Sequence, residues 1–210
     1  MSSTLPRPWS SSPAAAALVV GPALLLTGVL LLPAPGAWTV SHLIFLAGTL
    51  AMLPAGMVLH RLLGDAAPPW VGRSSVALTV AGALALAGQF FIDLVVLRLA
   101  AGDRETAGAM FDLLQGAPAF ALTFYTVGPA LLFTGLGSFG AAMVVRSGRR
   151  HWPGWTLVGG TLVMGAARVA GARPGEVAGL VLILVALALT ARSVVAGGVG
   201  PGPEPVSPRR

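Results

Sequence analysis

Four polar side chains could act together inside an otherwise apolar part of this chain. Asp93 and Gln89 lie in the run GQFFIDLVVLR (88–98), four residues apart and therefore on one face of a helix. Arg168 lies in a later apolar segment, and His42 lies at the start of an earlier one. If these segments cross a membrane, Asp93 and Arg168 both fall about 9 Å from the bilayer centre toward the same side, at 1.5 Å of rise per residue. We therefore predict an outward-facing polar cluster of Asp93, Gln89 and Arg168, with His42 at its mouth.

Two interpretations of this cluster stay open. Ionisable groups inside a membrane are costly, and they often mark a substrate or proton site. Asp93 and Arg168 could instead form a structural ion pair that fastens two helices, with Gln89 donating to the carboxylate. A cavity beside Asp93 would favour a site, whereas direct packing of Asp93 on Arg168 would favour the ion pair.

The composition places these residues in a membrane protein. Of the 210 residues, 55% are hydrophobic and 10% are charged, whereas soluble domains carry about 25% charged residues. The apolar residues form blocks of roughly 20, which match a hydrocarbon core of about 30 Å. We predict an all-α polytopic membrane helix bundle with six transmembrane helices, at residues 14–33, 39–60, 74–98, 118–145, 153–172 and 176–196.

The two ends of the chain are polar and rich in Pro with Ser or Gly. Residues 1–13 and 197–210 cannot bury enough apolar surface to order themselves, so we predict disordered tails around a transmembrane domain at 14–196. The first apolar segment could instead be a cleaved signal peptide, because Arg7 precedes it and PAPGA (33–37) follows it. Its apolar run of about 19 residues exceeds the usual signal core of roughly 7 to 15, so we expect the segment to be retained.

The arginines predict how the chain is oriented. Placing the N-terminus inside leaves most arginines on the cytoplasmic side and most acids outside. We therefore expect the cytoplasmic (inner) membrane of a bacterium, with both termini cytoplasmic and the lipid bilayer as partner. The arginines form no patch with interleaved aromatic residues, so no nucleic-acid partner is expected. A homo-oligomer or a partner membrane subunit stays open.

The residue types that are missing exclude several kinds of site. The chain has no cysteine, which excludes disulfides, thiolate metal sites and a cysteine nucleophile. Its three histidines are His42, His60 and His151, and the first two would lie about 27 Å apart on one helix. They could not share one metal ion or haem iron, so we expect no metal and no cofactor. The sequence also lacks nucleotide-binding and hydrolase motifs.

One connection is long enough to hold structure of its own. In residues 103–115, Asp103 is suited to an N-cap, acids crowd the first turn, and apolar residues cluster toward the end. We predict a short amphipathic helix on the outer surface. It could be a simple connector or a lid over a site.

A repeated string suggests two related halves. VGPALLLTG (20–28) recurs as VGPALLFTG (127–135), and GTLAM (48–52) is echoed by GTLVM (160–164). Three helices in each half would make the second half enter the membrane from the opposite side. We therefore predict a 3+3 inverted repeat of the kind found in secondary transporters.

The repeated string carries a glycine and a proline in each half. Proline removes a backbone donor, so we predict helix kinks at Gly21 and Pro22 and at Gly128 and Pro129. Paired interruptions in two halves point to a binding site. The alternative is that both pairs serve only helix packing.

Three stretches carry a resemblance to a known group. SHLIFLAGTLAMLPAGMVLHRLL (41–63), FFIDLVV (90–96) and the acidic connector after them resemble uncharacterised multi-pass membrane proteins of high-GC actinobacteria. The resemblance implies a bacterial membrane protein and carries no activity over to any residue.

Three functions are compatible with the sequence. The first is a small transporter-like or permease-like protein, which the repeat and the polar cluster favour. The second is a membrane-embedded enzyme that acts on a lipid or isoprenoid, with Asp93 as an acid. The third is an accessory or structural subunit without a site. A transporter should show two superimposable halves, an enzyme a closed apolar pocket ending at Asp93, and an accessory subunit a filled bundle.

Overall fold

The computed structural model describes residues 11–64, 68–101, 103–147 and 151–197, and every regular element in them is helical. The element bounds are α1 Ser11–Leu31, α2 Trp38–Leu63, α3 Pro69–Leu99, α4 Arg104–Gln115, α5 Pro118–Phe120, the π-helical segment η2 Ala121–Val127, α6 Gly128–Ser147, α7 Trp152–Ala170 and α8 Arg173–Gly197. The all-α class is confirmed. Most of the two predicted tails, residues 1–10 and 198–210, lies outside the described residues.

Five helices in the described residues are long and apolar enough to cross a membrane: α1, α2, α3, the continuous helix from α5 through α6, and α8. The predicted sixth, α7, has 19 residues, but Trp152, Pro153, Trp155 and Arg168 dilute its apolar content. The six-span prediction is therefore only partly confirmed. Three helices also begin at least three residues earlier than predicted, α1 at Ser11, α3 at Pro69 and α8 at Arg173. Each has a proline in its first turn, where proline is tolerated because the first helical N–H groups need no partner within the helix.

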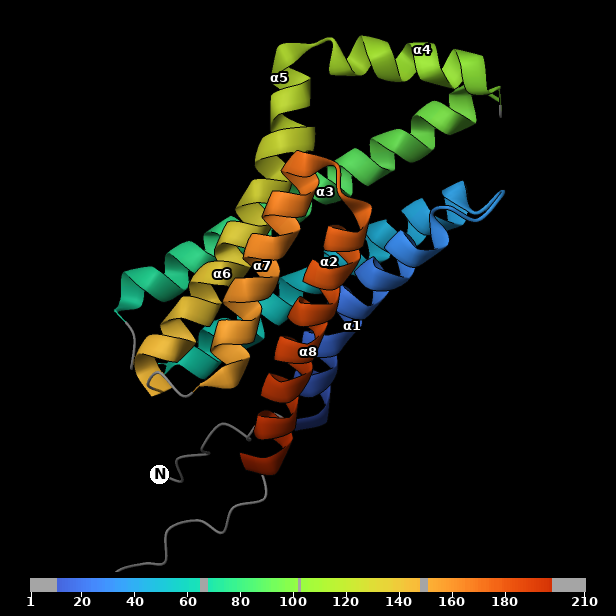
Figure 1. Ribbon diagram of the computed structural model, residues 1–210. Helices are drawn as coiled ribbons and strands as arrows, with labels where there is room; N and C mark the ends of the chain where they lie inside the picture. The colour runs from blue at the N-terminus through green and yellow to red at the C-terminus, as the bar shows by residue number, and fades with distance from the viewer. Residues whose placement is uncertain (1–10, 65–67, 102, 148–150, 198–210) are drawn as a thin grey trace, which may run out of the picture.

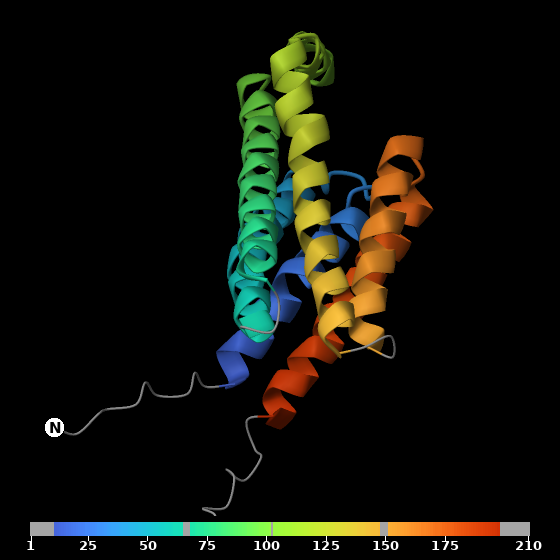
Figure 2. The same cartoon turned by 90° about the vertical axis from the view of Figure 1, so that its left-hand side faces the viewer.

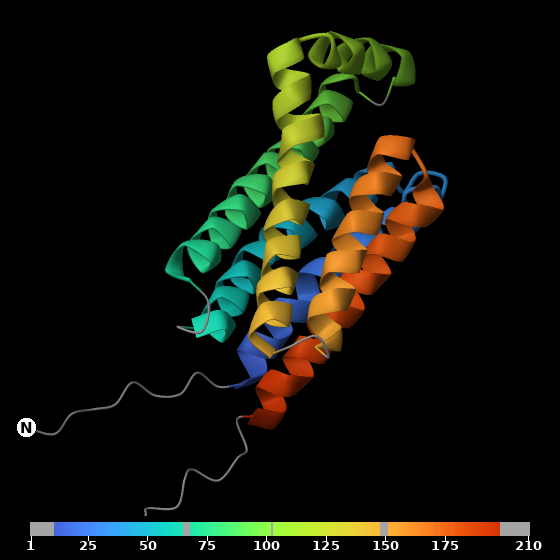
Figure 3. The same cartoon turned by 60° about the vertical axis from the view of Figure 1, so that its left-hand side comes forward.

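The six long helices form a closed ring. Successive neighbours pack in the order α1, α2, α3, α6, α7 and α8, and α8 packs back on α1. The helices alternate in direction, so α1 begins and α8 ends at the same end of the bundle (Figures 1 and 2). Helix α4 lies across the opposite end, beyond the loop that joins α1 to α2 (Figures 1 and 3). All six helices can therefore contribute side chains to one interior.

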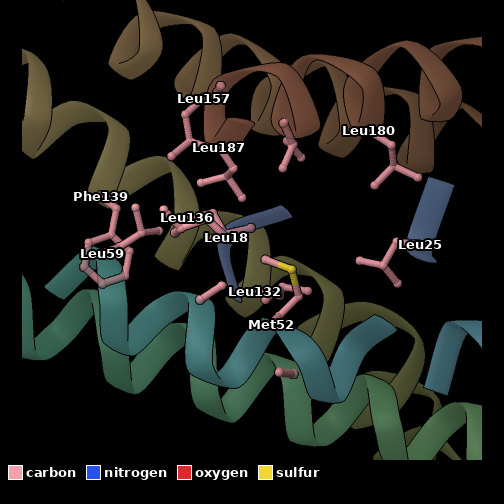
Figure 4. Close-up of a cluster of buried hydrophobic side chains, with 14 of the residues drawn as sticks. Leu18, Leu25, Met52, Leu59, Leu132, Leu136, Phe139, Leu157, Leu180 and Leu187 are labelled. Carbon is pink, nitrogen blue, oxygen red and sulfur yellow. The ribbon is translucent and has the colours of Figure 1, made fainter. Parts of the chain in front are cut away.

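Close packing fills the middle of this ring. Leu18, Met52, Leu132 and Phe139 are completely buried, and Figure 4 shows them among leucines from α7 and α8. Lipid chains are as apolar as these side chains, so dispersion from close packing contributes more to helix association than exclusion of water.

Glycines bring the helix backbones together. A Cβ on Gly140 would lie 2.8 Å from the Gly154 carbonyl oxygen, and a Cβ on Gly154 would meet the Gly140 oxygen equally closely. Helices α6 and α7 can therefore approach at this level only because both residues lack a side chain. Gly159, also on α7, has no neighbour within 4 Å of its Cβ position.

Two arginines bind the carbonyl ends of helices. Arg146 of α6 donates to the Leu62 and Leu63 carbonyl oxygens at the end of α2. Arg173 Nη2 of α8 donates to the Val29 oxygen near the end of α1, at 2.6 Å. A cation at a helix C-terminus pairs the last carbonyls and opposes the negative end of the helix dipole.

Candidate functional site

A cavity of about 310 Å³ lies inside the ring, and residues from all six long helices line it. His42, Gln89, Asp93 and Arg168 are all among its lining residues, so the four side chains predicted to cluster do share one space. Two of its lining residues show where the cavity lies along the bundle: Arg168 is near the end of α7, and His42 is near the start of α2. The cavity is therefore at the end of the bundle opposite the start of α1 and the end of α8.

Asp93 is buried, 5% exposed, and its carboxylate has two close partners. The Tyr125 hydroxyl donates to Oδ1 at 2.9 Å. His42 Nε2 lies 3.8 Å from Oδ2, which is too long for a direct hydrogen bond. Gln89 lies one turn deeper on the same face of α3 and also faces the carboxyl. The carboxylate is thus held by neutral donors from one side and left with room on the other.

The alternative interpretation, an ion pair between Asp93 and Arg168, is not what the structure shows. Arg168 Nη1 lies 3.4 Å from Glu176 Oε1 on α8 instead. Helix α6 lies between α3 and α7 in the ring, which puts Asp93 and Arg168 on different walls, whereas Glu176 follows Arg168 directly after the short turn into α8. The pairing was considered because the two residues have equal depth in a membrane. Residues at one depth can pair only if their helices also lie next to each other, and α3 and α7 do not.

The tautomer of His42 follows from its other contact. Nδ1 lies 2.8 Å from the Trp38 carbonyl oxygen, and a carbonyl can only accept, so Nδ1 carries the hydrogen. In a neutral ring Nε2 is then a lone-pair acceptor that faces the Asp93 carboxylate. Two acceptors 3.8 Å apart repel each other unless a proton or a donor group lies between them. A hydrogen bond between His42 Nε2 and Asp93 Oδ2 would therefore need one more hydrogen.

A third unpaired acceptor lies beside the cavity. Gln89 is 5% exposed, it lines the cavity, and its Oε1 is enclosed by protein with no hydrogen-bond partner among the described residues. A buried acceptor without a donor costs about 1 to 3 kcal/mol. This end of the cavity is therefore short of donors at Asp93 Oδ2 and His42 Nε2, and the protein next to it is short of one at Gln89 Oε1.

The rest of the cavity wall is apolar and aromatic. Phe45 and Phe90 stack with their centroids 4.9 Å apart, and the His42 ring meets both of them edge-on. Trp38 covers the other face of His42, with ring centroids 3.6 Å apart. These contacts fix the imidazole in one orientation and surround the acceptors with aromatic carbon.

The π-helical segment positions Tyr125. The Gly128 N–H bonds to the Thr123 carbonyl, five residues back, just before Pro129 removes the next backbone donor. Such π-turns re-aim side chains and are frequent at functional sites. Here the turn directs the Tyr125 hydroxyl to Asp93 on the neighbouring helix. The π-helical segment ends directly before Gly128 and Pro129, where a kink was predicted, and Pro129 lines the cavity.

The matching pair in the first half behaves differently. Helix α1 runs without a break through Gly21 and Pro22. A Cβ on Gly21 would lie 2.6 Å from the Met52 sulfur, so this glycine permits α1 to pack on α2. The two pairs are therefore not structurally equivalent, and only the second one reaches the cavity.

Two lining residues were missed in the sequence. Glu176 and Arg173 line the cavity opposite Asp93, and neither was among the predicted site residues. Arg173 is bonded to the end of α1 and Glu176 is paired with Arg168. The sequence feature that could have indicated the pair is the spacing of Arg168 and Glu176, which lie on either side of a short turn that contains Gly171.

Helix α4 has the predicted cap and touches the site indirectly. Asp103 is its N-cap and accepts from the Glu105 and Thr106 N–H groups, which confirms the predicted cap. Thr106, through its hydroxyl and then its N–H, holds the pKa of the exposed Asp103 carboxyl below its ordinary value of 3.8. Phe111 of α4 lies 6.3 Å from Trp38, centroid to centroid. The helix thereby contacts the aromatic stack above the cavity.

The donor set does not suit a metal ion. Within the described ranges, no three His, Asp or Glu side chains converge. His42 and Asp93 would supply two ligands, fewer than the three or four protein ligands of zinc sites. No family model, curated protein or solved structure matches this chain.

Proposed function

We propose that this protein is a permease-like membrane protein whose cavity binds a small primary amine in its ammonium form. The observation that carries the proposal is the donor deficit around Asp93. Asp93 Oδ2 and His42 Nε2 are acceptors at one end of the cavity, and Gln89 Oε1 is a further unpaired acceptor enclosed by the protein beside them. An ammonium group brings three donors and a positive charge to this position.

The surrounding groups favour an organic cation over an anion. Both arginines that line the cavity are already engaged, Arg168 by Glu176 and Arg173 by the Val29 carbonyl. Phe45 and Phe90 supply aromatic faces beside the carboxylate, and aromatic faces attract cations. A cavity of about 310 Å³ is at the small end of ligand pockets, which run from roughly 300 to 1,000 Å³.

The arrangement of helices supports a permease-like architecture with six spans and a 3+3 inverted repeat. If α1 to α3 form one half and α6 to α8 the other, each contact within the first half has a counterpart in the second. The junction of α3 with α6 then corresponds to that of α8 with α1. The halves differ most in their middle helices, since α2 has 26 residues and α7 has 19.

Binding of benzylammonium to the full chain in lipid nanodiscs tests the proposal. We expect benzylammonium to raise the unfolding temperature of the wild type, and benzyltrimethylammonium, which has the charge without N–H donors, to do so much less. Asp93→Asn should abolish the shift. The matched control is Glu176→Gln, which removes the other cavity carboxylate and should keep the shift.

Transport is measured separately, as counterflow of labelled benzylamine in proteoliposomes. Counterflow that depends on Asp93 would support the permease-like role. An unchanged thermal shift in Asp93→Asn would refute the amine site. Binding without counterflow would refute the permease role and favour an enzyme or an accessory subunit that uses the same site.

A further inference from the structure

A second hollow lies on the outside of the bundle, between α6 and α7. It is a groove of about 920 Å³ that begins at η2 and follows both helices. Its walls are mainly small or apolar, including Ala130, Gly137, Ala141 and Gly165. Arg168 belongs to this groove and also to the inner cavity.

The groove exists because the two helices diverge. At Gly140 and Gly154 the backbones touch, and a Cβ on Gly137 would still lie 2.9 Å from the Thr161 hydroxyl. One turn further along α7, a Cβ on Gly165 would have nothing within 4 Å. Figures 2 and 3 both show α6 and α7 close together where α6 ends and α7 begins, and farther apart toward the end of α7.

One exposed cationic side chain borders the wide end. Arg168 is the only charged residue among the described residues that line the groove. Its contact with Glu176 uses only Nη1, so the other N–H groups of the guanidinium have no partner among the described residues. The Arg168 side chain is 45% exposed, and it lies two residues from the end of α7. A long arginine side chain near the end of a membrane helix extends toward the headgroup region, and its planar donors match a phosphate.

We infer that the groove between α6 and α7 holds an anionic phospholipid, with an acyl chain along the small residues and the phosphate at Arg168. A groove that faces hydrocarbon is filled by lipid, because empty walls forfeit dispersion contacts. Basic pockets between membrane helices select anionic headgroups. This site is separate from the amine site, because neither Asp93 nor Gln89 lines the groove.

Native mass spectrometry of the delipidated full chain tests the inference, with phosphatidylglycerol and phosphatidylcholine of identical acyl chains as probes. We expect at least tenfold tighter binding of one phosphatidylglycerol than of one phosphatidylcholine. Arg168→Gln should remove this preference. Gly165→Leu should weaken both lipids by filling the groove without a clash, and Gly159→Leu is the matched control, because Gly159 also has free space and does not line the groove.

Each outcome bears on the inference directly. Tight phosphatidylglycerol binding in Gly165→Leu, or a preserved headgroup preference in Arg168→Gln, would overturn it. Displacement of the lipid by millimolar inorganic phosphate would also overturn it, because the site would then recognise a free anion. Ala130→Leu fills the groove from α6, so a folding defect in Gly165→Leu still leaves a variant that decides the question.

Discussion

Tyr125 donates its hydroxyl hydrogen to Asp93 Oδ1 at 2.9 Å, and this bond joins η2 to α3. It pairs the only tyrosine of the chain with an aspartate that is 5% exposed. The bond leaves the other carboxylate oxygen facing His42 and the cavity. Tyr125 therefore stabilises the carboxylate without closing the space next to it.

Tyr125→Phe should lower the free energy of unfolding by about 1.5 to 3 kcal/mol, because Asp93 loses a donor to a charged group. The measurement is equilibrium unfolding in mixed micelles. Thr126→Val deletes an exposed hydroxyl in the same π-helical segment and should have little effect. The cost of Tyr125→Phe should shrink in the Asp93→Ala background, and an unchanged cost there would show that the bond contributes nothing.

Arg168→Gln and Arg173→Gln should differ in their effect on stability. Arg168 forms an exposed ion pair with Glu176, which is worth roughly 0 to 1 kcal/mol. Arg173 caps the end of α1 at the Val29 oxygen from a half-buried position, and a charged hydrogen bond contributes about 1.5 to 3 kcal/mol. Thermal unfolding should therefore show the larger loss for Arg173→Gln, and the reverse order would mean that Arg168 fastens helices after all.

Gly140→Ala and Gly159→Ala should change stability in opposite directions. A methyl group on Gly140 meets the Gly154 carbonyl oxygen at 2.8 Å and Val158 at 3.0 Å, and such overpacking costs roughly 1 to 3 kcal/mol. A methyl group on Gly159 meets nothing within 4 Å, and alanine gains up to about 1 kcal/mol over glycine in a helix. Equal unfolding midpoints for the two variants would contradict the close approach of α6 and α7.

The cap of α4 should depend on pH. The lowered pKa of Asp103 means that the folded helix prefers the carboxylate, so the cap is fully effective above pH 3.8 and is lost as pH falls through the still lower native pKa. Hydrogen exchange at the Thr106 amide should be faster in Asp103→Ala than in the wild type at neutral pH. This difference should vanish below the native pKa.

Asp112→Ala, at the other end of α4, is the control for this cap. It should leave exchange at Thr106 unchanged. Identical exchange in Asp103→Ala and the wild type at neutral pH would show that the side chain does not cap the helix.

Cysteine labelling should decide whether α7 crosses the membrane. The chain has no cysteine, so single substitutions can be labelled in cells with an impermeant maleimide without background. Ala34→Cys, Gly108→Cys and Ala172→Cys should react from one side, and Ser147→Cys only from the other. Reaction of Ala172→Cys and Ser147→Cys from the same side would mean that α7 does not span.

Much of the local structure followed from short-range patterns. The apolar blocks located the long helices, because a helix satisfies its own backbone in an apolar medium. The N-cap at Asp103 was predictable because its partners are two and three residues away. The start of α3 at Pro69 was not predictable in this way, because Arg73, Ser74 and Ser75 interrupt the apolar run.

The sequence by itself determined the long helices and the position of Asp93 along its helix, because these depend on residue type and on 1.5 Å of rise per residue. Only the tertiary structure decided which neighbours each polar group meets. The ring places α6 between α3 and α7, so Arg168 pairs with Glu176 and Asp93 with Tyr125. Depth is a property of one helix, whereas the partner across a cavity depends on the packing order of all six, which rests on glycine contacts far apart in the sequence.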